Sequence, residues 1–111
     1  MDKTSKILEW IDVLRRRPLM ILSDTSFFSL RGYIEGYIDA LGLAYDIPKF
    51  TLRISLWYQQ KVGMQSDVLW INQIVSYNSD KSDEELKLMV LQLLTDFFEE
   101  NPEWYKPEYW S

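Results

Sequence analysis

The chain has 111 residues and a formal net charge of −5, and it contains no His and no Cys. This length corresponds to one domain, and a hydrophobic content of 47% is too high for a disordered chain. Imidazole and thiolate groups are absent and only four Gly are present, so the chain lacks the commonest catalytic side chains and a glycine-rich phosphate loop. We expect a binding protein that is not an enzyme and has no cofactor and no metal site.

The first half of the chain predicts two amphipathic helices. Apolar residues at i, i+4 and i+7 mark a helix over residues 4–16, which ends before Pro18. A longer apolar stripe predicts a second helix over residues 25–45. In this helix Gly32 and Gly36 lie four residues apart on one face. Because each Gly destabilises a helix by roughly 1 kcal/mol relative to Ala, we expect another helix to cross closely at this face.

Three further helices are expected in the second half. The segment 48–62 has an ambiguous period, and we assign it to a helix because a lone strand would have no sheet to join. A fourth helix is predicted over residues 66–77. A fifth runs to residue 100 from a capping box formed by Ser82 and Glu85. The predicted fold class is therefore all-α, a single-domain bundle of about five helices spanning residues 1–111.

The C-terminal tail, residues 102–111, has two Trp and two Tyr without helical periodicity, and Glu103 and Glu108 lie among them. Trp and Tyr are enriched at binding hot spots, so the tail could contact a partner. Equally, it could cover a groove of its own core. The carboxylates at the two ends of the fifth helix are accounted for by capping and by a solvated helix face, and the loop 78–84 lacks the Gly of a calcium-binding loop.

Charge is distributed unevenly along the chain. Residues 1–61 contain nine basic and seven acidic side chains, a net charge of +2, whereas residues 62–111 contain three and ten, a net charge of −7. An acidic half argues against nucleic-acid binding and favours a basic protein partner, although an ordinary solvated surface would show the same excess. No apolar run is long enough to span a membrane, and the N-terminal residues lack the apolar stretch of a secretory signal. We expect a cytoplasmic protein without a membrane partner.

A set of short motifs along the chain resembles a known family. The first half carries Arg17-Pro18-x-Met20, Leu30, Ile34-x-Gly36-Tyr37 and Ala40. The second half carries Phe50, Trp57-Tyr58, Trp70, Ile74, Asp83-Glu84-Glu85 and Leu94 with Phe97-Phe98. This pattern resembles small bacterial immunity proteins of polymorphic toxin systems, including contact-dependent growth inhibition. Leu19 stands where that family has Gly, and Ile21-Leu22-Ser23 stands where it has Tyr-Leu-Gly.

The resemblance implies a small, non-catalytic cytosolic protein that neutralises a cognate toxin C-terminal domain by direct contact. Many such toxins are basic nucleases, and basic clefts attract acidic surfaces. The candidate toxin-binding residues are Asp83, Glu84, Glu99, Glu100, Glu103, Trp104, Tyr105 and Trp110. Two alternatives stay open at this point. One is a helical adaptor or structural protein of another complex, and the other is an enzyme that uses only Asp, Glu, Tyr or Lys.

Overall fold

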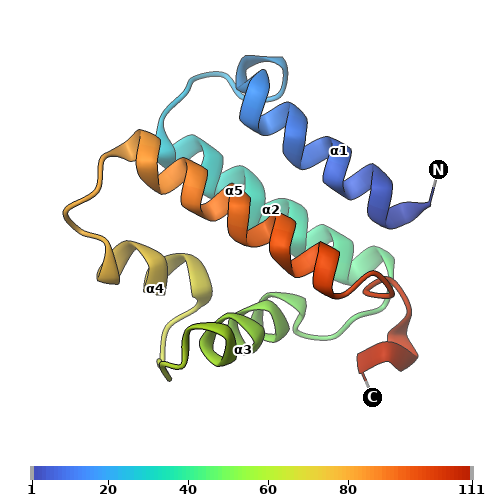
Figure 1. Ribbon diagram of the computed structural model, residues 1–111. Helices are drawn as coiled ribbons and strands as arrows, with labels where there is room; N and C mark the ends of the chain where they lie inside the picture. Colours follow the sequence, from blue (N-terminus) through green and yellow to red (C-terminus); the bar gives the residue numbers. More distant parts are fainter. Residues whose placement is uncertain (1, 111) are drawn as a thin grey trace.

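Five α-helices form the fold of the computed structural model, which describes residues 2–110 (Figure 1). They are α1 (Lys3–Arg16), α2 (Phe27–Ala44), α3 (Phe50–Val62), α4 (Trp70–Tyr77) and α5 (Asp83–Glu100). Short 3-10 turns lie at Pro18–Met20 and Pro107–Trp110. Residues 2–110 contain no strand, which confirms the predicted all-α bundle of five helices. Within the same range, no helix combines the length and apolar character needed to cross a bilayer.

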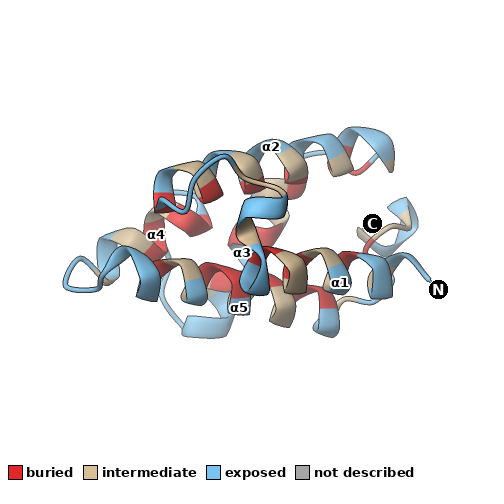
Figure 2. Ribbon diagram, turned by 90° about the horizontal axis from the view of Figure 1, so that it is seen from above, coloured by how far each residue is buried: buried red, intermediate tan, exposed pale blue. Residues whose placement is uncertain are grey.

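The central helix is α5, which packs against each of the other four. Its buried residues are Leu86, Val90, Leu91, Leu94, Phe97 and Phe98. Seen from above, α1 and α5 lie on one side of the molecule and α2 on the other, with buried residues facing inward between them (Figure 2). The capping box that begins α5 is present as predicted: the Ser82 hydroxyl accepts the Glu85 N–H, and the Glu85 carboxylate accepts the Ser82 N–H.

The exposure of α3 resolves its ambiguous period. Phe50, Ile54 and Tyr58 are buried, whereas Leu52 and Leu56 are exposed. Spacings of four residues place the buried side chains on one face of a helix, so the alternation of Leu52, Ile54 and Leu56 did not indicate a strand. The helix starts at Phe50, after Lys49 in a left-handed conformation with φ 57°.

Two other helices begin later than the spacing predicted. The Ser26 hydroxyl caps α2 by accepting the Ser29 N–H at 3.1 Å, so α2 starts at Phe27 and not at residue 25. The expected start of α4 at residue 66 is wrong by four residues. The buried hydroxyl of Ser55 accepts the backbone N–H of Trp70 at 2.9 Å, and this long-range contact holds the chain at the true start of the helix.

The predicted helix crossing at Gly32 and Gly36 does not occur among residues 2–110. Both residues are exposed, and a Cβ added at either position would meet no heavy atom within 4 Å. The close approach is at Gly42, where an added Cβ would lie 3.1 Å from the carbonyl oxygen of Ile47 and 3.2 Å from the Cβ of Phe50. Gly42 thus allows the tight turn between α2 and α3.

Candidate functional site

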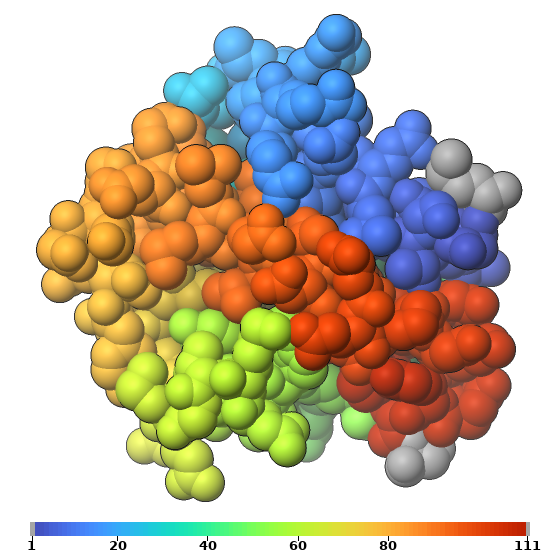
Figure 3. All heavy atoms as spheres, viewed as in Figure 1, coloured from blue at the N-terminus to red at the C-terminus, as the bar shows by residue number. Residues whose placement is uncertain are grey.

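The candidate acidic residues form two groups at opposite ends of α5. Asp83 and Glu84 lie in its first turn, and Glu99 and Glu100 in its last. A helix of 18 residues is about 27 Å long, so one compact site cannot contain both groups. Figure 3 shows the surface of α5 as a band between α1 and α3. The two acidic groups lie in the first and last turns of this helix. All four side chains are exposed.

At the N-terminal end of α5, one carboxylate is neutralised within the chain and the other is not. Glu84 lies 2.6 Å from the Lys87 ammonium, which also donates to the carbonyl oxygen of Thr25. No ion pair involves Asp83 among residues 2–110. An acidic side chain in the first turn interacts favourably with the helix dipole, so Asp83 contributes to helix stability while its charge stays open to solvent.

The C-terminal end of α5 brings three of the predicted residues close together. The Glu100 carboxylate accepts hydrogen bonds from Lys61 Nζ at 2.8 Å and Trp57 Nε1 at 3.1 Å, and these bonds lower the pKa of Glu100. Glu103 pairs with Lys106 at 2.6 Å. Glu99 is exposed and forms no ion pair within the described part of the chain. Glu99 therefore carries the least compensated charge at this end.

Trp104 is part of the hydrophobic core, with 0% of its surface exposed. Its ring lies 5.1 Å from Tyr45, 5.8 Å from Phe50 and 5.3 Å from Phe98, measured between ring centroids. The prediction that Trp104 contacts a partner is wrong for this structure, because no part of the side chain reaches the surface. The backbone around it forms a turn, in which the Trp104 N–H donates to the carbonyl oxygen of Asn101.

The end of the tail also packs on its own domain. The ring of Trp110 stacks on Phe97 with centroids 6.0 Å apart, and its Nε1 donates to the carbonyl oxygen of Trp104 at 2.8 Å. Arg53 donates to the Trp110 carbonyl oxygen and places its guanidinium over the Trp110 ring. Trp110 and Tyr105 are half-buried. Of the two interpretations of the tail, the structure shows the one in which it covers its own core.

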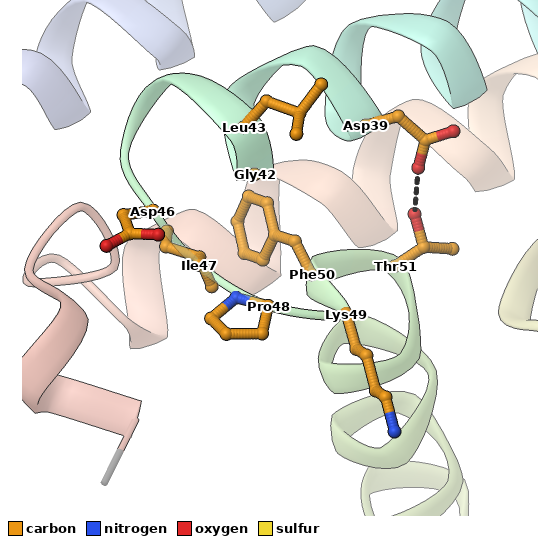
Figure 4. Close-up of a pocket in the computed structure, with 9 residues that line it drawn as sticks. All are labelled: Asp39, Gly42, Leu43, Asp46, Ile47, Pro48, Lys49, Phe50 and Thr51. Carbon is orange, nitrogen blue, oxygen red and sulfur yellow. Dashed lines mark hydrogen bonds between the residues drawn. The ribbon is translucent and has the colours of Figure 1, made fainter.

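A hollow with a volume of about 420 Å³ lies beside the turn between α2 and α3 (Figure 4). Its apolar lining includes Leu43, Pro48 and Phe50. Asp39 lies at the rim, where its carboxylate accepts a hydrogen bond from the Thr51 hydroxyl at 3.1 Å. Among residues 2–110 no group of three or more carboxylates could hold a metal ion. The hollow is suited to an apolar side chain and offers no converging acid–base pair.

The outer face of α2 exposes apolar side chains that the apolar spacing in the sequence did not predict. Phe28 and Leu43 are 85% and 87% exposed, more than any other large apolar side chain described. Between them Gly32, Gly36 and Ala40 are exposed as well. A solvated helix face normally carries charged residues. The four-residue spacing of these small residues is the corresponding signal in the sequence, although it predicts a contact within the chain.

Comparisons of the chain with protein-family models, with curated proteins and with solved structures found no match.

Proposed function

We propose that the chain is an immunity protein that binds a cognate bacterial toxin domain in the cytoplasm and neutralises it by contact, without catalysis. The observation that carries this proposal is the exposed acidic charge of the C-terminal half. Nine of the ten acidic residues in 62–111 are exposed, Asp96 being half-buried. Only three basic residues lie in the same range. The resemblance of the motifs to immunity proteins supports the same function.

An acidic surface of this kind attracts a basic partner over distances set by the ionic strength. A toxin that cleaves nucleic acid needs a basic cleft for phosphates, so its charge is complementary to this chain. Complementary charge raises the association rate, and the effect falls as salt screens the charges. In this proposal the C-terminal end of α5 faces the toxin through Glu99, Glu100 and Glu103, and the more distant Asp83 and Glu84 add to long-range attraction.

The uncompensated carboxylate of Glu99 gives the sharpest test of this surface. Glu99→Gln removes one exposed charge without breaking an ion pair described in the structure. Glu9→Gln on α1 is a matched control, because Glu9 is also exposed on a helix and also lies outside the ion pairs. With the toxin domain encoded immediately upstream, we expect Glu99→Gln to slow association at low salt more than Glu9→Gln does. The difference should shrink as salt is added.

Neutralisation itself is tested by co-expression. Cells that produce the toxin domain should grow when they also produce this chain, and purified chain should inhibit the toxin in stoichiometric amounts. Equal association rates for the two variants would reject the acidic end of α5 as the binding surface. Binding without protection would reject immunity and leave the helical adaptor as the function.

A further inference from the structure

The start of α1, the end of α2 and the tail lie together at one end of the bundle (Figure 1). Another hollow, the α1–α2 pocket, opens between these three segments and has a volume of about 360 Å³. At ~30 Å³ per water this volume corresponds to about a dozen waters, which suits a small organic molecule. Its lining includes Lys3, Lys6, Tyr37, Tyr45, Trp104 and Tyr105.

Aromatic rings that contact one another form the walls of this pocket. Between α1 and α2, Trp10 stacks on Tyr37 with ring centroids 4.0 Å apart, and its Nε1 donates to the Tyr33 hydroxyl at 3.0 Å. Two turns further along α2, the ring of Tyr45 meets Trp104 of the tail edge to face, with centroids 5.1 Å apart. Because these rings restrain one another, the pocket is formed before any ligand enters, as most ligand sites are.

The pocket is basic, although the chain as a whole is acidic. Lys3 and Lys6 are three residues apart, so they lie on the same side of α1. Neither forms an ion pair among residues 2–110. The third charged group of the lining is Asp2, whose carboxylate caps α1 by accepting the Ser5 N–H at 2.7 Å. Two ammonium groups and one carboxylate give the pocket a charge of +1, whereas the hollow beside the α2–α3 turn has two carboxylates and one ammonium group.

Helix stability does not account for the two lysines. The N-terminal end of a helix favours acidic side chains and disfavours cations, because it is the positive end of the dipole. The first turn of α1 has no acidic residue and begins with Lys3. The Lys3 ammonium lies 5.1 Å from the centroid of the Tyr105 ring, and this contact holds the charge at the edge of the pocket. The basic charge is thus placed where it serves the pocket and not the helix.

The pocket also contains hydrogen-bond donors that have no acceptor. The hydroxyls of Tyr37, Tyr45 and Tyr105 form no hydrogen bond among residues 2–110. The Nε1–H of Trp104 is buried and also lacks an acceptor in this range. Unpaired donors and uncompensated ammonium groups favour a ligand with acceptor oxygens and negative charge. The surrounding rings favour a flat, apolar body.

We propose that the α1–α2 pocket binds a small aromatic carboxylic acid in its ionised form. Lys3 and Lys6 bind the carboxylate through charge-assisted hydrogen bonds. The rings of Tyr37 and Tyr45 contact the aromatic body of the ligand. A carboxylate balances the pocket charge of +1, whereas a phosphate monoester brings a charge of about −1.5 to −2. This site goes beyond the proposed toxin contact, and its test requires no toxin.

Amide NMR spectra of the wild-type chain, titrated with indole-3-acetate, test the site. From the usual binding energy per atom of small ligands, we expect a Kd of about 1 mM or tighter. The largest shifts should occur at Lys6, Ile7 and Tyr105. Indole lacks the carboxylate and tryptamine carries an ammonium group in its place, so both should bind more weakly. Equal affinity for indole would overturn the proposal, as would largest shifts at Lys49 and Thr51 beside the other hollow.

Removing one lysine tests the role of charge. Lys6→Gln should keep the fold, because the side chain is exposed and the helix dipole disfavours a cation at this end. We expect its affinity for indole-3-acetate to fall roughly three- to fivefold, as for a solvent-exposed ion pair. Affinity for indole should not change. Lys49→Gln is the matched control, because Lys49 is also exposed and outside the ion pairs of residues 2–110. Equal affinities for the two variants would overturn the proposal.

Discussion

Replacing Trp104 by Ala tests whether the tail belongs to the core. A Trp side chain buries roughly 150–250 Å². At about 25 cal/mol per Å² this corresponds to roughly 4–6 kcal/mol of burial, and aromatic-to-Ala substitutions in cores lose about 3–5 kcal/mol. Trp104 is 0% exposed and contacts the rings of Tyr45 just after α2, Phe50 in α3 and Phe98 in α5, so the surroundings cannot readily collapse into the space. We expect Trp104→Ala to lower the free energy of unfolding by about 4 kcal/mol.

Thermal unfolding followed by circular dichroism measures this loss. At about 4 °C per kcal/mol for a domain of this size, Trp104→Ala should lower Tm by roughly 15 °C. Trp104→Phe is a matched control, because it keeps a ring in the site and removes a buried Nε1–H that has no acceptor. Trp104→Phe should lower the free energy of unfolding by less than Trp104→Ala does. A Trp104→Ala chain that melts within about 2 °C of the wild type would refute the assignment of the tail to the core.

Three further predictions concern glycines, a cap and an ion pair. Gly36→Ala should stabilise the free chain by about 1 kcal/mol. Gly42→Ala should destabilise it, because the new Cβ would lie 3.1 Å from the backbone of the following turn. Measured Tm values should therefore shift in opposite directions for the two variants. Ser82→Ala should lose about 1 kcal/mol in urea unfolding, because the capping box is broken. The Lys61 hydrogen bond lowers the pKa of Glu100. The stability that this hydrogen bond contributes is therefore present above the ordinary glutamate pKa of about 4.3 and is lost as the pH falls through the lowered pKa of Glu100. The Tm difference between Glu100→Gln and the wild type should vanish in acid.

Local patterns predicted the helices because each one buries an apolar stripe. The capping box joins Ser82 to Glu85, three residues later, so the local sequence was enough to predict it. The start of α4 was not, because it depends on the hydroxyl of Ser55, fifteen residues earlier in the chain. Helix ends that are held by such distant contacts leave no signal in the local apolar spacing.

The site was less predictable than the fold, because spacing reveals a face but not what lies against it. The four-residue spacing of Gly32 and Gly36 predicted a close helix crossing, yet no helix among residues 2–110 crosses at these glycines. In the tail, Glu103 and Trp104 are adjacent in sequence, but Trp104 is fully buried and Glu103 is exposed. Aromatic residues without periodicity are equally consistent with docking on the core and docking on a partner, and only tertiary contacts distinguish the two.

The central claim, neutralisation of a toxin by direct contact, is tested most directly by a pull-down with the toxin domain encoded immediately upstream, at low and at high salt. We predict a tight complex at low salt that weakens at high salt, because exposed carboxylates attract the basic toxin. No complex at either salt, with a folded chain and a folded toxin domain, would contradict the claim and leave the helical adaptor as the better account.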